Sequence, residues 1–368
     1  MEMGFPFSLG TGFQKEFMTD VHIKGSYKAL PPYGRSTEEI LPVVPFWLNG
    51  EPDRLIRKAV KIFEGAGVDY RYGFMDVGEV FTQTSFEEKN QVYIREARRL
   101  GKSVLRTALE SSGWEPESLD YLITVSCTGI MIPSLDAYII NETGLRGDIY
   151  RLPITEMGCV AGVSGLIYAY QLLRSVPGKR AALIAVEGPS ATFQHWDHSM
   201  ANIISAAIFG DGAACVLLSS EKDENGPKIL GEGMYHFPNS TRLMGFDLKN
   251  TGLKMVLDPA VPETIADHFH PMLVPFLDQH GKDVGDLDCL IFHPGGRKIV
   301  QTVETLFEGH TADLSDTREI LRLYGNMSSV TVLHVLQRFL DRDIPRGSLG
   351  LMLSFGPGFT AQRMLLEF

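Results

Sequence analysis

The chain of 368 residues has no apolar run near the length of roughly 18 residues that spans a bilayer. Basic residues are also scarce: 34 Lys and Arg stand against 45 Asp and Glu, a formal net charge of -11. This balance argues against a nucleic acid as the partner. A charged segment followed by an apolar core, the mark of a secretory signal, is absent from the start. We therefore expect a cytoplasmic protein with no membrane span.

Cysteine is rare, with four in the chain, and their spacing is neither paired nor of a metal-binding type. They are Cys127, Cys159, Cys215 and Cys289. Such spacing is typical of free thiols in a reducing compartment. Two histidine pairs lack a third clustered ligand, so we expect surface residues and no metal site. These pairs are His195 with His198 and His268 with His270.

Alternating apolar segments predict the fold class. In the first part of the chain we expect strands at 21–30, 121–126, 150–154, 181–186 and 213–219. Helices are expected at 37–47, 51–64, 87–112 and 163–173. Strands that alternate with helices indicate an α/β fold with mixed or parallel sheets. Residues 1–20 show no period, and their role is left open.

A polar stretch with Gly and Pro at 221–227 predicts a boundary between two lobes, 1–225 and 226–368. The second lobe repeats the alternation, with strands at 287–292, 349–355 and 362–368. Its helices are expected at 262–277, 299–307, 318–323 and 328–340, the first interrupted at Pro271 and Pro275. The two lobes are thus of similar make-up.

Cys159 lies in the stretch RLPITEMGCVAGVSGLIY at 151–168, between a strand and a buried helix. A cysteine at such a turn lies near the positive end of the helix dipole, which favours thiolate over thiol. Glycines around it let a bulky group approach the backbone. A packed core cysteine is the alternative, because free Cys is among the most buried residue types.

Two polar residues of the second lobe complete a possible site. His293 follows the strand CLIF, and Asn326 lies in a turn, YGNMSS, that opens a helix. Either could be structural, since Asn is common in turns and caps. With Cys159 they supply a nucleophile, a base and a neutral donor for an oxyanion, the parts that acyl-thioester chemistry needs. Papain-like proteases use the same residue types, so the set alone does not decide the reaction.

The motifs MGCVAG, FGDGAA, FHPGG, YGNMSS and FGPGF occur in this order along the chain. Together they resemble the type III polyketide synthases, the chalcone-synthase-like enzymes, over nearly the whole chain from residue 21. The segment CTGIMIPSLDA is most similar to bacterial members. The resemblance implies a thiolase-like αβαβα layered fold with two similar lobes. It also implies a homodimer, and no cofactor or metal beyond the CoA of the acyl-CoA starter and malonyl-CoA substrates.

The resemblance also implies a role for each residue of the set. Cys159 matches the nucleophile that takes the starter acyl group, and His293 pairs with its thiolate. His293 and Asn326 match the pair that binds the malonyl thioester and stabilises the enolate formed on decarboxylation. That enolate would extend the acyl chain by repeated Claisen condensation, and cyclisation would give a pyrone or phenolic, resorcinol-like product. The starter and the number of extensions are left open.

Cavity residues follow from the same resemblance. Phe209 matches an aromatic gatekeeper, and Met255 stands where the second gatekeeper is usually aromatic. Methionine is flexible and could admit bulkier or aliphatic chains. Cys127 stands where plant members carry a hydroxyl residue, and Ile132 where a methionine crosses into the partner's cavity. The remaining cavity-shaping positions are Thr192, Ser328, Gly356 and Pro357.

Lys58 and Lys61 fall near two cationic positions that hold CoA phosphates in the family, but Gly65 replaces the third. Two other readings stay open. A ketoacyl-carrier-protein synthase III shares the fold and the Cys-His-Asn set. An inactive thiolase-fold scaffold protein would share the fold alone.

Overall fold

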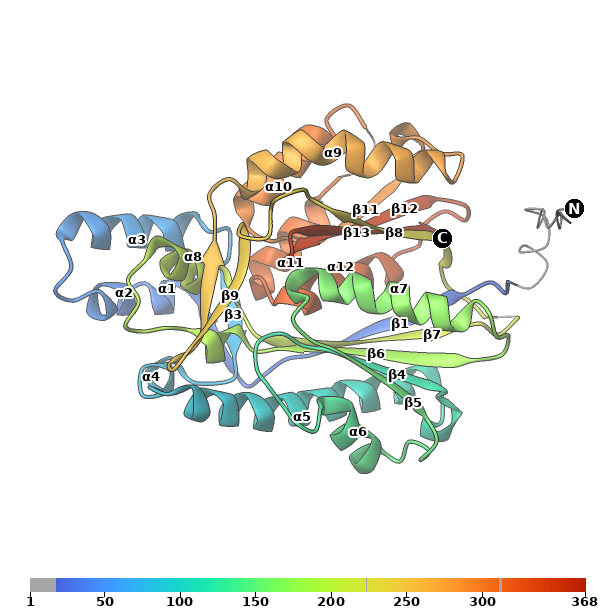
Figure 1. The fold of residues 1–368 in the computed structure, drawn as a ribbon, viewed down its shortest axis with the longest axis horizontal. Helices are drawn as coiled ribbons and strands as arrows, with labels where there is room; N and C mark the ends of the chain where they lie inside the picture. Colours follow the sequence, from blue (N-terminus) through green and yellow to red (C-terminus); the bar gives the residue numbers. More distant parts are fainter. Residues whose placement is uncertain (1–17, 223, 311–312) are drawn as a thin grey trace, which may run out of the picture.

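The computed structural model describes residues 18–222, 224–310 and 313–368, which form five layers (Figure 1). One outer layer holds helices α5 (Phe86–Ser112) and α6 (Leu135–Thr143), and the other holds α9 (Val261–Asp278) and α10 (Arg297–Leu306). Between them, two half-sheets enclose a central layer of α7 (Ala161–Leu173), α11 (Ser315–Tyr324) and α12 (Thr331–Leu340). This arrangement confirms the predicted α/β class and its αβαβα layering. Residues 1–17 lie outside the described part.

The two half-sheets belong to one continuous nine-stranded sheet. The first half has the order β5 (Tyr150–Ile154), β4 (Tyr121–Val125), β6 (Arg180–Glu187), β7 (Gly212–Ser219) and β1 (His22–Ala29). The second half has the order β8 (Lys228–His236), β13 (Thr360–Glu367), β12 (Leu349–Gly356) and β11 (Cys289–Phe292). They meet at one antiparallel pair, His22 with Lys228. The lobe boundary near residue 225 falls between β7 and β8 and stays a prediction.

Packing explains why helix α7 is mostly apolar. It is flanked by both half-sheets and by α12, so most of its residues are buried in one core. The outer helices bury only one face each, against separate cores on the far sides of the half-sheets. Ends of α5 are set by sequence: Ser85 and Glu88 form a capping box, and Gly113 ends the helix at φ 70°.

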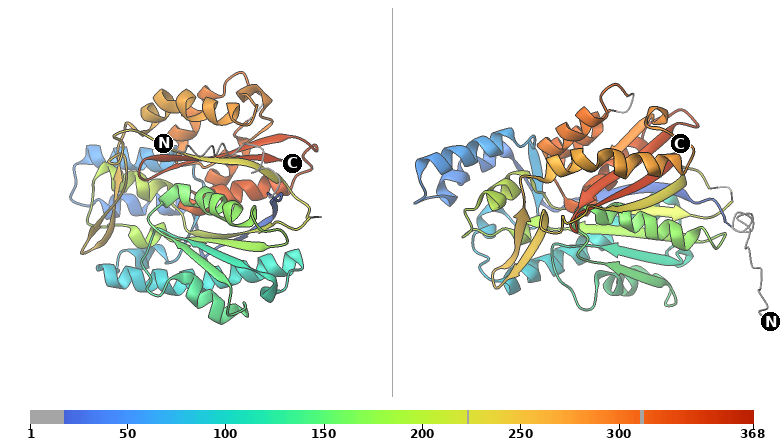
Figure 2. Two further views of the ribbon diagram at one scale, coloured as in Figure 1. Left: turned by 45° about the vertical axis from the view of Figure 1, so that its right-hand side comes forward. Right: turned by 45° about the horizontal axis from the view of Figure 1, so that its top comes forward.

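A smaller group of elements extends from one end of the layers (Figure 2). It contains α1 (Thr37–Ile40), α2 (Val43–Trp47), α3 (Asp53–Gly65) and α8 (Met200–Ile208), which share a fourth core. Beside it lie the pair β2 (Tyr33–Ser36) and β3 (Tyr70–Gly73), helix α4 (Val77–Val80) and the hairpin of β9 (Met244–Lys249) and β10 (Gly252–Leu257). Short 3-10 helices complete the chain: η1 (Pro116–Ser118), η2 (Gly158–Val160), η3 (Pro189–Thr192), η4 (Val284–Asp286) and η5 (Ser328–Val330).

Several sequence expectations are wrong in detail. The helix expected at 37–47 is two helices, because the chain turns at Leu41 and Pro42. Helix α9 is continuous through Pro271 and Pro275, which we expected to interrupt it. Helices α6 and α8, strand β8 and the β9–β10 hairpin were not anticipated. No helix of the described residues is long and apolar enough to cross a membrane.

Candidate active site

Three side chains from different parts of the chain line one cavity, here called the central cavity. They are Cys159, His293 and Asn326, which are all buried. Cys159 comes from the first half of the fold and the other two from the second. The structure therefore brings together the residues that the sequence singled out as a candidate set.

Cys159 lies in η2, at the turn that leads from β5 into α7. The preceding Gly158 has φ 58°, and a Cβ there would lie 2.6 Å from the Cδ of Pro357. Gly356 is equally restricted, because its Cβ would lie 2.8 Å from the backbone nitrogen of Val160. The loop with Gly356 and Pro357 thus packs directly on the cysteine turn, as expected for cavity-shaping residues.

Ser354 in β12 stabilises the turn that contains Cys159. Its hydroxyl donates a hydrogen bond of 2.8 Å to the backbone carbonyl of Cys159. Ser354 was not singled out from the sequence. The signal was present, since a small hydroxyl residue in a buried strand requires a nearby acceptor.

His293 emerges at the end of β11, and its backbone nitrogen donates to the carbonyl of Leu353 in β12. Both ring nitrogens are buried, and neither has a hydrogen-bond partner among the described residues. Burial lowers the pKa of His293 to about 3. The imidazole is therefore neutral at pH 7 and can accept a proton or bind an oxygen of a ligand.

Asn326 is held next to Phe209 by a backbone bridge between the two residues. The Oδ1 atom of Asn326 accepts from the backbone N–H of Ser328 at 2.8 Å, which assigns the orientation of its amide. The Nδ2 atom donates to the carbonyl of Gly295 at 3.2 Å. An amide nitrogen has two hydrogens, so one remains available to donate a hydrogen bond to a ligand in the central cavity.

Burial raises the pKa of Cys159 to about 12 and outweighs hydrogen bonds from Ser328 and Asn326, which lower it. This direction is opposite to the one expected from the helix dipole of α7. The Sγ atom lies 3.7 Å from the Oγ of Ser328, and the structure shows no hydrogen bond to His293. Burial thus favours a neutral thiol and a neutral imidazole in the free protein, and the expected ion pair stays a prediction.

The raised pKa of Cys159 predicts how its thiol reacts in the free protein. We expect its alkylation by iodoacetamide to accelerate about tenfold per pH unit between about pH 7 and 9, because the thiolate fraction grows tenfold per unit below the pKa. Mass spectrometry of the Cys159 peptide measures the rate, with Cys159→Ser as the blank. A rate that is already constant across this range would show that the thiolate exists at neutral pH.

Glu187 is a buried acid that the sequence did not reveal. Its carboxylate accepts from the backbone N–H of Cys127 at 3.0 Å and from the hydroxyls of Thr128 and Ser329 at 2.8 and 2.6 Å. Burial raises its pKa. Because Thr128 and Ser329 lie on opposite halves of the fold, Glu187 ties the two walls of the central cavity together.

Cys127 and Ser328 both line the central cavity, as expected from the resemblance. The Oγ of Ser328 lies 3.5 Å from the Sγ of Cys127 and 3.7 Å from that of Cys159, so one hydroxyl stands between two sulfur atoms. Ser328 adopts this position with φ 51°, a left-handed conformation uncommon for a residue with a side chain. Burial raises the pKa of Cys127 as well.

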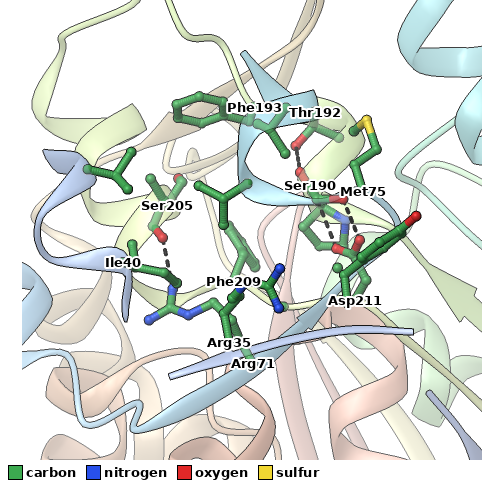
Figure 3. A pocket seen from close by; sticks show the side chains of 18 of the residues that line it. Arg35, Ile40, Arg71, Met75, Ser190, Thr192, Phe193, Ser205, Phe209 and Asp211 are labelled. Carbon is green, nitrogen blue, oxygen red and sulfur yellow. Dashed lines mark hydrogen bonds between the residues drawn. The ribbon is translucent and has the colours of Figure 1, made fainter. Parts of the chain in front are cut away.

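A second cavity, here called the side cavity (Figure 3), shares lining residues with the central cavity. Pro189, Phe209 and Met255 line both. The two proposed gatekeepers therefore stand at the junction of two cavities. Thr192 faces the side cavity, and its hydroxyl donates to the carbonyl of Pro189.

Three expected site residues are exposed and line neither cavity. Ile132 is 93% exposed in the single chain. Lys58 and Lys61 are exposed on α3, and their role in holding CoA stays a prediction. His195 corrects an expectation, because it is buried between the rings of Phe81 and Trp196 rather than on the surface. The described residues contain no group of three side chains that could hold a metal ion.

Comparison with known proteins agrees with the geometry. The family of chalcone and stilbene synthases matches with its N-terminal domain at residues 76–222 and its C-terminal domain at 233–368. A phloroglucinol synthase from Pseudomonas fluorescens is 33% identical over 84% of this chain and 89% of its own length. A 1,3,6,8-tetrahydroxynaphthalene synthase from Streptomyces coelicolor is 32% identical over 83% of this chain and 82% of its own.

Solved structures give the same result. The crystal structure of the Streptomyces coelicolor synthase, a bacterial type III polyketide synthase, superposes with a TM-score of 0.89 at 30% identity, over 94% of this chain and 99% of that one. A polyketide synthase from the brown alga Ectocarpus siliculosus superposes with a TM-score of 0.86 at 26% identity, over 95% and 98%. The chain therefore belongs to the chalcone and stilbene synthase family, the type III polyketide synthases.

Proposed function

We propose that the protein loads an acyl group from a CoA thioester onto Cys159 and extends it by repeated decarboxylative condensation with malonyl-CoA. Cyclisation then releases a pyrone or phenolic product. The observation that carries this proposal is the meeting of Cys159, His293 and Asn326 in one buried cavity. The family match favours it over the alternative of a ketoacyl-carrier-protein synthase III.

Loading requires a proton acceptor beside the thiol, and neutral His293 supplies it. As the Cys159 proton moves to the imidazole, Sγ attacks the thioester carbonyl carbon. The bond from that carbon to the CoA sulfur breaks, and the departing CoA takes the proton from His293. A neutral Cys159 thiol and a neutral His293 imidazole suit this step, because no buried ion pair then exists before the substrate is bound.

During extension, negative charge develops on an oxygen that His293 and Asn326 can stabilise. When the malonyl carboxylate leaves as CO2, the electron pair passes to the thioester oxygen as an enolate. The Nδ2 of Asn326 and a ring N–H of His293 stabilise this oxyanion in a site with little water. The enolate carbon attacks the acyl carbonyl carbon on Cys159, a carbon–carbon bond forms and the bond to Sγ breaks, which leaves the extended chain on CoA. The Cys159 thiolate then takes the chain back from CoA for the next cycle. The chemistry needs no metal or organic cofactor beyond CoA.

The direct test incubates the protein with malonyl-CoA and an acyl-CoA starter in the absence of any carrier protein. We expect products longer than a single condensation, which mass spectrometry detects. Products limited to one condensation, or dependent on added carrier protein, would contradict the proposal. No condensation at all would favour a scaffold role.

A homodimer is proposed as well. Ile132 and Ile130 expose apolar side chains on the same loop, at 93% and 44%, where the family pattern places a residue that crosses to the partner. A cytoplasmic location is proposed from the four cysteines, which are all unpaired in the structure.

Met255 should set the starter range. Met255→Phe replaces a flexible thioether at the junction of the two cavities with a rigid ring, so we expect a shift of preference toward shorter starters by about tenfold in kcat/KM. Competition between short and long acyl-CoA starters measures the shift. Val256→Phe is the matched control, because this neighbour lines neither cavity. An unchanged preference would remove Met255 as a gate.

A further inference from the structure

We propose that the side cavity binds a free aromatic carboxylate, with the carboxylate on Arg71 and the ring among Trp47, Phe81 and Phe193. All four side chains line this cavity. Cys159 lines the central cavity and not the side cavity. The site is therefore separate from the reacting sulfur, and the inference does not depend on the proposed function.

Arg71 is a buried cation without an acidic partner. It is 7% exposed, and its Nη1 and Nη2 atoms donate to the carbonyl of Ala206 at 2.8 Å and to the hydroxyl of Thr37 at 3.1 Å. These two bonds use two of the five N–H groups of a guanidinium. The Nε atom has no partner, and no acid shifts the pKa of Arg71, among the residues that the structure describes.

This arrangement favours an anionic ligand. Burial alone lowers the pKa of Arg71 to about 10, so the guanidinium is still charged at pH 7. A buried charge without a counter-ion destabilises the free protein, and a bound anion removes this penalty. A carboxylate suits the position, because its two oxygens match the planar fork of a guanidinium.

The strand pair β2–β3 brings further donors to the same side of the cavity. Arg35 is directly opposite Arg71 in the antiparallel register, so the two side chains share one face (Figure 3). Arg35 has an ion pair with Asp76, whereas Arg71 has none. Tyr33 and Tyr72 also line the cavity, and their hydroxyls have no hydrogen-bond partner in the described part of the chain. These hydroxyls can donate to a carboxylate or to a ring substituent.

The acid on the cavity wall does not serve as the counter-ion of Arg71. Asp211 accepts from the backbone N–H of Phe74 at 2.6 Å and of Ser190 at 2.8 Å, and from the Ser190 hydroxyl. Burial raises the pKa of Asp211 to about 7, so about half of these carboxyls are neutral at pH 7. Repulsion between Asp211 and a bound carboxylate is reduced to the same extent.

The rest of the wall favours an aromatic ring on the ligand. The ring of Phe193 lies edge to face with Trp47 at 5.0 Å and with Phe81 at 5.7 Å. The guanidinium of Arg71 lies 5.9 Å from the ring centre of Phe63, which also lines the cavity. A ligand ring can make the same edge-to-face contacts, which a saturated ring cannot. A small hydrated inorganic anion would lose its water among these apolar side chains without such a gain.

Calorimetry on the full chain tests the site with benzoate and with benzamide, which has a similar shape and no charge. We expect benzoate to bind at least about tenfold more tightly. In the Arg71→Met protein the two ligands should bind within about twofold of each other. Arg71→Lys keeps the charge but not the planar fork, so it should bind benzoate about tenfold more weakly and still prefer it to benzamide. Arg54→Met is the matched control, because it removes an exposed cation of α3 that lines neither cavity, and it should bind benzoate normally.

Three further measurements fix the ligand class and the location. Cyclohexanecarboxylate should bind more weakly than benzoate, inorganic phosphate should not displace benzoate, and the Cys159→Ala protein should bind benzoate unchanged. The inference is overturned by equal binding of benzoate and benzamide to the unchanged protein, or by a preference for benzoate that survives in Arg71→Met. Displacement by phosphate, equal binding of cyclohexanecarboxylate, or loss of binding in Cys159→Ala would also overturn it. If Arg71→Met does not fold, which its thermal unfolding reveals, an unchanged affinity of Arg71→Lys for benzoate is decisive against the site.

Discussion

Replacement of Cys159 by alanine is expected to lower polyketide formation by about a thousandfold or more. The acyl group then has no covalent carrier in the central cavity. Decarboxylation of malonyl-CoA should continue at a measurable rate, because His293 and Asn326 remain to stabilise the enolate. Liquid chromatography with mass spectrometry follows both reactions, with acetyl-CoA as the product of decarboxylation alone.

Cys215→Ala is the matched control for this experiment. Cys215 lies in β7, fully buried and outside both cavities, so its loss should leave polyketide formation close to normal. Undiminished polyketide formation by the Cys159→Ala protein would place the acyl carrier elsewhere. Loss of both reactions together would mean that decarboxylation also requires the sulfur.

Replacement of Asn326 by aspartate is expected to slow malonyl-CoA decarboxylation by about a hundredfold to a thousandfold. The carboxylate keeps the acceptor for the backbone N–H of Ser328, so the turn before η5 can retain its shape. It loses both Nδ2 hydrogens and brings negative charge toward a developing oxyanion. The expected defect is therefore chemical rather than structural.

Release of CO2 from malonyl-CoA measures this defect, and the midpoint of thermal unfolding checks that the protein is folded. Asn141→Asp, on the exposed face of α6, makes the same chemical change away from the cavities and should leave the rate unchanged. A normal rate in the Asn326→Asp protein would remove Asn326 from enolate stabilisation.

Much of the fold was readable from hydrophobic spacing. Helix α5 and strands β4 and β6 were predicted within a residue or two, because their buried faces are continuous. Strand β8 was missed since its sequence KILGEGMYH is half-buried and contains two glycines, which strand patterns disfavour. The β9–β10 hairpin is also mostly half-buried, and it was missed for the same lack of contrast.

For the site, the residue types and motifs singled out Cys159, His293 and Asn326, but spacing could not place them in one cavity. The helix dipole predicted a lowered pKa for Cys159, but burial raises it. A sequence shows the helix dipole and hides the depth of burial. Glu187 gave no local signal either. Its partners Cys127 and Thr128 are neighbours in the chain, but Ser329 comes from a distant segment, and only the fold brings both segments to one carboxylate.

The β9–β10 hairpin forms its own two-stranded sheet, apart from the nine-stranded one, yet it contributes Met244, Phe246, Met255 and Leu257 to the central cavity. A segment that lines this cavity thus takes no part in the strand pairing of the layered scaffold. A hairpin transplanted from a related synthase should change which molecule is made while the host keeps its reaction machinery.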